Sequence, residues 1–299
     1  MSDPPYRGVF PIPVTPFNDD GSLDLEGLKE VVEFCVVAGA HGIVGPVNAG
    51  EFSALSDQER MQVVETISGA LDGRLPYVAS ATGVSAEVAV LFARHALDHG
   101  ADALIAMPPY VKKAHLDGVR NYYESLCAAT DLPVFIQNHP IGLPMSPALL
   151  AELANNIPNV LYIKEEIPPF THSVSADIEA CGQDIEGIFG GAAGKHMLDE
   201  LNRGASGTMP ACEVTDVHVA VWDAYESGDR KRAREIFNRL LPLINFESLH
   251  HIYLYKEVLK RRGIIRSAYV RVSDTKPLDM FDHEELDAIL ADIADLYTA

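Results

Sequence analysis

The chain has 299 residues, of which 47% are hydrophobic and 22% are charged, as in an ordinary globular enzyme. Its formal net charge of −20 argues against nucleic acid and anionic membranes as partners. The N-terminus lacks a secretion signal pattern and no uninterrupted apolar run is long enough to span a membrane, so we expect a cytoplasmic protein. The four cysteines are scattered without metal-ligand spacing, and no metal or diffusible cofactor is predicted.

Eight short apolar runs predict buried parallel strands. Three of them follow helices that end at Gly39, Gly100 and Gly204, which suit the left-handed position just past a helix end. In chain order the eight runs lie within residues 8–16, 38–47, 76–81, 99–109, 133–138, 160–165, 186–191 and 203–210.

Helical patterns separate these strands. Residues 56–71 open with a capping box formed by Ser56 and Glu59, and Ser146 followed by proline begins a later helix. Alternating strands and helices, repeated eight times, predict an α/β fold of the (β/α)8 TIM barrel type. A doubly wound sheet is the structural alternative, but it usually has fewer strands, and no G-x-G-x-x-G follows the first strand here.

After about residue 212 the strand patterns stop. Helical patterns follow at 213–227, 230–245, 247–262 and 282–298. The first of them completes the barrel, so we divide the chain into a barrel of residues 1–228 and a helical C-terminal extension of residues 229–299. No linker rich in glycine, serine or proline separates the two, and we therefore expect the extension to pack on the barrel.

Active sites of this fold lie at the C-terminal ends of the strands. Lys164 ends the apolar run VLYI, so its side chain is expected in the barrel mouth. A lysine in dry surroundings has a lowered pKa and becomes a nucleophile toward ketones. From spacing alone, a structural lysine paired with Glu165 or Glu166 explains the pattern equally well.

Several motifs resemble those of the dihydrodipicolinate synthase and N-acetylneuraminate lyase family, over nearly the whole chain. GPVNAGEFSALSDQER resembles the family's G-T-T-G-E-x-x-x-L-x-x-x-E-R signature, and PVFIQNHP its fifth-strand motif. MPPY places the active-site tyrosine at Tyr110, and YIKE places the Schiff-base lysine at Lys164. The resemblance implies a Schiff-base lyase for a small 2-oxo acid that needs no cofactor. Relatives are usually homotetramers, dimers of dimers, and we expect that assembly here.

The departures from the family pattern narrow the reaction. Gln137 stands where the family has a catalytic tyrosine, and an amide cannot exchange a proton as a phenol does. The arginine that holds a substrate carboxylate in dihydrodipicolinate synthases is missing after Pro140. Asn48, Gln137 and Glu166 resemble instead the branch of 2-keto-3-deoxy-L-arabonate dehydratases. We therefore predict dehydration of a 2-keto-3-deoxy sugar acid through a lysine iminium.

Three other functions stay open: a class I aldolase or hydratase-aldolase, a dihydrodipicolinate synthase, and a non-catalytic binding barrel. The general base also stays open among Glu166, Glu165, Tyr110 and His139. The residues predicted to be catalytic are Lys164, Tyr110 and Glu166. The residues predicted to bind substrate are Asn48, Ala49, Gly50, Gln137, Asn138, Gly191 and Thr208.

Overall fold

The computed structural model describes residues 6–112, 114–272 and 276–299. Its eight strands are all parallel and follow the order β1-β8-β7-β6-β5-β4-β3-β2. A hydrogen bond from Val44 N to Pro11 O (3.2 Å) joins the two ends of the sheet, so the predicted barrel is confirmed. The strands are β1 Gly8–Val9, β2 Ile43–Gly45, β3 Tyr77–Ser80, β4 Ala103–Ala106, β5 Val134–Asn138, β6 Val160–Glu165, β7 Gly187–Gly190 and β8 Gly207–Thr208.

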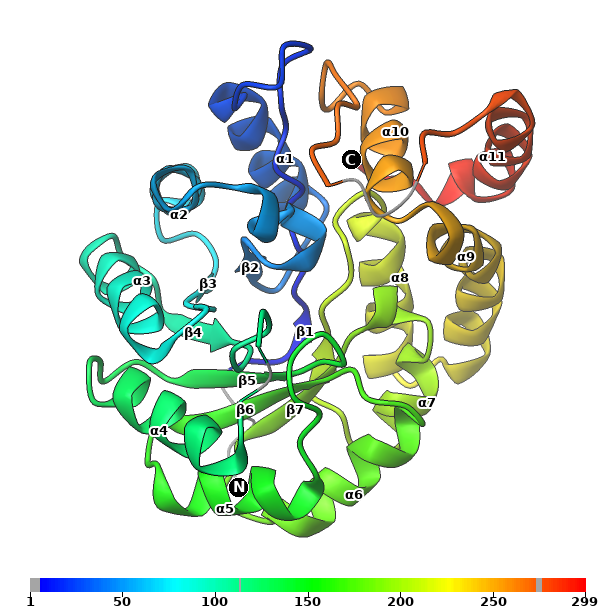
Figure 1. Ribbon diagram of the computed structural model, residues 1–299. Helices are drawn as coiled ribbons and strands as arrows, with labels where there is room; N and C mark the ends of the chain where they lie inside the picture. The colour runs from blue at the N-terminus through cyan, green and yellow to red at the C-terminus, as the bar shows by residue number, and fades with distance from the viewer. Residues whose placement is uncertain (1–5, 113, 273–275) are drawn as a thin grey trace.

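Helices form a ring around the sheet (Figure 1). The capping box of Ser56 and Glu59 and the cap at Ser146 are confirmed, and Gly39 and Gly100 have φ near +80° as predicted. None of the described helices is both long and apolar enough to cross a membrane. The helices are α1 Leu25–Val37, α2 Asp57–Leu71, α3 Ala86–Asp98, α4 Leu116–Cys127, α5 Pro147–Asn156, α6 Thr171–Cys181, α7 Met197–Asn202, α8 Thr215–Glu226, α9 Arg230–His250, α10 Ile252–Arg261 and α11 Met280–Ile293.

The barrel interior is filled by aromatic side chains. Phe135 of β5 stacks on Tyr162 of β6 with ring centroids 4.4 Å apart, and Phe189 of β7 packs against both. Side chains alternate between the two faces of a strand, so residues two positions further along also point inward. Gln137 and Lys164 are in register and lie directly above this aromatic layer, at the mouth of the barrel.

The extension begins with one long helix. The sequence pattern predicted a break between residues 245 and 247, and this was wrong, because α9 continues unbroken to His250. The chain turns instead at His251, whose φ of 47° ends α9 and begins α10. As a result Ile244, Glu247 and Ser248 share one helix, and all three line the cavity described below.

A buried ion pair ties this extension to the loop after β2. Lys256 Nζ lies 2.5 Å from Glu51 Oε1 and donates to Tyr269 O at 2.8 Å. The other oxygen of Glu51 accepts from the backbone N–H groups of Arg271 and Val272 at 2.8 and 2.9 Å. Glu51 directly follows the Asn-Ala-Gly segment of the signature motif, so the extension helps to hold that segment.

Arg271 makes a second, more exposed contact, with both carboxylate oxygens of Glu59 at 2.8 and 2.9 Å. Hydrogen bonds from Arg271 lower the pKa of Glu59 from its usual 4.5 to about 2. The stabilisation is therefore complete above pH 4.5 and is lost as the pH falls toward 2. We expect Glu59→Gln, which preserves the cap on Ser56, to lower the free energy of unfolding by about 1 kcal/mol at neutral pH. Denaturant titrations of both proteins should converge by pH 2, and a constant difference would contradict the assignment.

Candidate active site

A cavity of 610 Å³ opens where the strands end. One part of its wall consists of residues at or just after the C-terminal ends of β1, β2, β5, β6, β7 and β8, and the other part comes from the C-terminal extension. The first group comprises Ile12, Asn48, Ala49, His139, Lys164, Glu166, Phe170, Ala192, Ala193, Lys195, His196, Met209 and Ala211. The second group comprises Ile244, Glu247, Ser248, His251 and Tyr255.

Lys164 lies at the floor of this cavity and is 2% exposed. Its Nζ atom is 3.3 Å from Glu166 Oε2, which also accepts a hydrogen bond from Gln137 Nε2 at 2.9 Å. Three predicted site residues therefore form one contiguous cluster. The amine that could attack a carbonyl carbon has a carboxylate within reach for proton transfer.

Glu166 is held in its ionised form. Burial opposes ionisation, but Lys164, His139 and the hydrogen bonds from Gln137 and Ala192 N outweigh it and lower the pKa of this carboxyl. A Cβ atom on Gly191 would lie 2.3 Å from Glu166 Cγ, so only glycine leaves room for the side chain there. Gly191 thus makes room for Glu166 and does not itself line the cavity, and its substrate-binding role stays a prediction.

Glu165 and Asn138 point away from the cavity, toward the helical layer. Asn138 Nδ2 donates to Glu165 Oε2 at 2.7 Å, and its Oδ1 accepts from Met145 N at 2.9 Å. Burial raises the pKa of Glu165 to about 9, with Asp177 as its hydrogen-bonding neighbour. Asn138 therefore does not line the cavity, and Glu166 is the carboxylate beside the lysine.

The remaining predicted binding residues separate into two groups. Asn48 and Ala49 line the cavity in the short 3-10 helix Asn48–Gly50. Gly50 lies behind them, where its carbonyl accepts a hydrogen bond from Thr15 Oγ1 at 2.6 Å. Thr208 is completely buried outside the cavity, and the next residue in the chain, Met209, occupies the wall instead. The expected contacts of Gly50 and Thr208 with substrate are thus not supported by their positions.

Residues 5–295 match the family model described as "Dihydrodipicolinate synthetase family". The chain belongs to this family. An L-2-keto-3-deoxyarabonate dehydratase from Azospirillum brasilense is 31% identical over 88% of this chain and 86% of its own length. A 4-hydroxy-tetrahydrodipicolinate synthase from Methanothrix thermoacetophila is 33% identical over 80% of this chain and 81% of its own. A crystal structure of a dihydrodipicolinate synthase superposes with a TM-score of 0.89 and 26% identity, covering 98% of this chain and 100% of that one. The protein is thus a lyase of the dihydrodipicolinate synthetase family.

Tyr110, predicted at the family's active-site tyrosine, does not line the cavity of this single chain. It follows β4, is partly exposed, and packs edge-to-face on Phe52 with ring centroids 5.4 Å apart. Burial raises the pKa of its hydroxyl, and nearby Arg60 opposes this shift. In this position the phenol is protonated near neutral pH, and its catalytic role stays a prediction.

Several wall residues were not predicted from the sequence. Phe170 and His196 stack with ring centroids 5.0 Å apart, and Phe170 has a φ of 38° at the start of α6. Ala192 and Ala193 both have left-handed φ angles, 49° and 57°, which cost free energy for residues with a Cβ atom. The alanine turn aims Ala192 N at Glu166, which offers a functional reason for the strained backbone.

His139 occupies the wall beside the lysine and the carboxylate. Its Nδ1 accepts a hydrogen bond from Ile141 N at 3.1 Å, so the neutral ring carries its proton on Nε2. Burial lowers the pKa of His139, with Lys164 acting in the same direction and Glu166 opposing it. The imidazole is therefore neutral near pH 7, and its Nε2–H group can donate a hydrogen bond.

Glu200 of α7 is a second buried acid behind the site. Burial and the charge of Glu166 raise its pKa to about 8, so it is protonated at neutral pH. A Cβ atom on Gly190 would lie 1.8 Å from Glu200 Oε2, which shows that the strand glycine admits this side chain. Its side chain points from α7 toward β7, and the hydrophobic pattern of the sequence did not predict this buried position.

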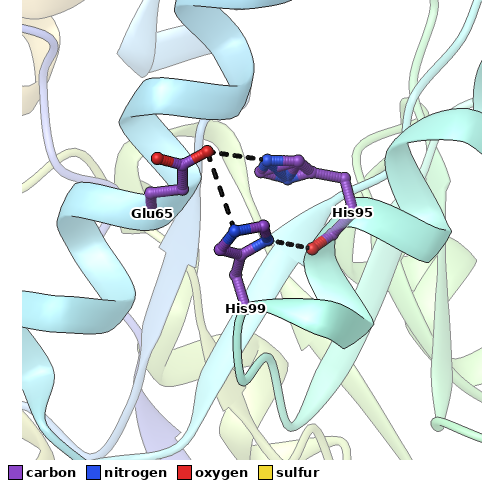
Figure 2. Close-up of side chains that lie close together, drawn as sticks. All are labelled: Glu65, His95 and His99. Carbon is purple, nitrogen blue, oxygen red and sulfur yellow. Dashed lines mark hydrogen bonds and ion pairs between the residues drawn. The ribbon is translucent and has the colours of Figure 1, made fainter.

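Outside the cavity, one group of three side chains in the described ranges has metal-ligand chemistry (Figure 2). His95 Nε2 and His99 Nε2 lie 3.0 and 3.8 Å from Glu65 Oε1. Glu65 is on α2, His95 is on α3, and His99 is the residue that caps the C-terminus of α3. The two rings stack with centroids 4.1 Å apart. The three side chains contact one another without an ion between them, and Glu65 and His99 are exposed to solvent. This group takes no part in the cavity chemistry.

Proposed function

We propose that this protein dehydrates a 2-keto-3-deoxy sugar acid, such as 2-keto-3-deoxy-L-arabonate, through a Schiff base on Lys164. The observation that carries the proposal is the cluster of Lys164, Glu166 and Gln137 at one end of the cavity, with contacts of 3.3 and 2.9 Å. It places an amine and an ionised carboxylate together, and an amide where the family's tyrosine phenol would act. The similarity to the Azospirillum brasilense dehydratase supports the same choice.

The proposed reaction begins with attack of the Lys164 amine on the C2 ketone, which releases water and forms an iminium. The iminium accepts electron density, so a proton on C3 becomes acidic and Glu166 removes it. The resulting enamine expels the C4 hydroxyl, which takes up the proton from Glu166 and leaves as water. The unsaturated iminium then loses a proton from C5 and gains one at C3, which leaves a C5 enol that tautomerises to the aldehyde. Hydrolysis of the iminium frees this semialdehyde and the lysine. Asn48 and Ala49 are proposed to hold the substrate carboxylate.

Gln137 favours dehydration over carbon–carbon cleavage. A retro-aldol step requires a base that removes the proton of the C4 hydroxyl, and an amide cannot serve as that base. Glu166 is committed to the amide of Gln137 and to Ala192 N, beside the lysine. A class I aldolase is the second candidate. In that reaction a water molecule bound to Glu166 would remove the proton of the C4 hydroxyl in place of the missing phenol.

The experiment that tests the proposal is incubation with a panel of 2-keto-3-deoxy acids, with products separated by mass spectrometry. We expect loss of one water molecule and a semialdehyde of the 2-oxoglutarate type from the five-carbon acid. Release of pyruvate would show an aldolase instead. Condensation of added pyruvate with aspartate semialdehyde would show a dihydrodipicolinate synthase, and trapping without turnover would show a binding barrel.

We further propose that the protein is a cytoplasmic homotetramer, a dimer of dimers. Tyr110 is followed by Val111, which is 71% exposed, and Ile141 of the loop after β5 is 49% exposed. Exposed apolar side chains on the loops that follow β4 and β5 favour an intersubunit contact there. In that arrangement Tyr110 would contribute to the site of a neighbouring subunit.

A further inference from the structure

The part of the cavity wall formed by α9 contains a buried acid that the proposed reaction does not use. Glu247 lines the cavity but is only 2% exposed. Among the described residues, neither of its carboxyl oxygens has a hydrogen-bond donor, and the same holds for Oε2 of Glu213. Buried carboxyl oxygens without donors are costly, so their retention beside a cavity calls for a ligand or a shared proton.

Glu247 and Glu213 face each other and share a side-chain contact. Glu213, which precedes α8, is 1% exposed. Two ionised carboxylates cannot donate to one another, so a hydrogen bond between them requires that one holds a proton. Burial raises the pKa of both groups, and the charge of Glu213 raises the pKa of Glu247 further.

Arg262 contacts Glu213, but its guanidinium is already bound by other groups. Arg262 binds the Asp216 carboxylate through two nitrogens at 2.7 and 3.0 Å, and it donates to the backbone oxygen of Glu213 at 2.9 Å. A pair that shares one proton consists of a protonated acid beside a carboxylate, one a donor and the other an acceptor. This pair is complementary to an alcohol, which both donates and accepts a hydrogen bond. It repels a distal carboxylate on the substrate.

We propose that Glu247, held by Glu213, recognises a hydroxyl group at the distal end of the substrate and makes the cavity selective for neutral hydroxylated chains over dicarboxylates. The inference rests on the proposed function, because only a sugar acid bound at Lys164 has such a hydroxyl. Pyruvate has no hydroxyl group of this kind. Ser248, the next residue of α9, also lines the cavity and adds a second polar group.

The test compares Glu247→Leu with Glu247→Gln. Each protein is titrated with pyruvate and with 2-keto-3-deoxy-L-arabonate, and iminium formation is measured by borohydride trapping and mass spectrometry. The leucine variant should weaken half-saturation by the hydroxylated acid about 10- to 100-fold and leave pyruvate within about twofold. The glutamine variant keeps a donor and an acceptor, so it should retain most of the affinity. Glu235→Gln, at an exposed position of the same helix, is the matched control.

An equal loss for both acids would show that Glu247 is merely structural, and unchanged half-saturation by the hydroxylated acid would show that the pair does not contact substrate. Trapping of pyruvate reports that each variant is folded. Because trapping measures binding before the committed step, selectivity stays measurable even if the wild-type protein releases pyruvate and is an aldolase. Failure of the dehydration proposal is therefore distinguishable from failure of this one.

Discussion

Lys164→Ala is expected to abolish covalent trapping of pyruvate and to lower turnover of the 2-keto-3-deoxy acid by at least about 10⁴-fold, because the electron sink of the reaction is lost. The measurement is borohydride reduction in the presence of pyruvate, followed by peptide mass spectrometry. Lys195 also lines the cavity and is the matched control. Lys195→Ala should leave the adduct on the peptide that contains residue 164, and an adduct that survives Lys164→Ala would overturn the assignment.

A variant of Glu166 distinguishes iminium formation from the later proton transfer. Glu166→Gln preserves the shape of the side chain beside Lys164 but removes the base that takes the C3 proton. We expect this variant to form the trapped pyruvate adduct while its turnover falls by about 10²- to 10⁴-fold, the usual contribution of a positioned base. Normal turnover by Glu166→Gln would move the role of general base to another residue of the wall.

Lys256→Met is expected to be the most damaging change to stability. The side chains of Lys256 and Glu51 are both 0% exposed, and their charged atoms lie 2.5 Å apart. Removing the ammonium leaves an uncompensated carboxylate in the interior, which costs about 3–5 kcal/mol of the free energy of unfolding. Denaturant titration or the thermal midpoint measures this loss.

Two companion variants make the result specific. Glu51→Gln combined with Lys256→Met should recover much of the lost stability, because no buried charge then lacks a partner. Lys231→Met removes a lysine that is 90% exposed and 3.8 Å from Glu235, and it should change stability by less than about 0.5 kcal/mol. A Lys256→Met protein as stable as the Lys231→Met protein would contradict the stabilising role of the pair.

The alternation of side chains along a strand explains which of the predicted site residues face the cavity. Along β5 and β6, Phe135 and Tyr162 fill the barrel interior, and Gln137, Lys164 and Glu166 keep the same parity into the mouth. Asn138 has the opposite parity and faces the helices, although it was predicted to bind substrate. The period of two was available in the sequence, but the position where each strand ends was not, and β8 shows this most clearly, because Met209 and not Thr208 faces the cavity.

The sequence by itself determined the barrel, the caps and glycine ends of its helices, and a lysine at the end of β6. These follow from local periodicity and from motifs within short segments. Only the tertiary structure decided that α9 continues past residue 245 to the cavity, that Glu51 pairs with Lys256, and that Glu247 meets Glu213. Such pairs join segments far apart in the chain, and the burial that shifts their protonation exists only after those segments have packed.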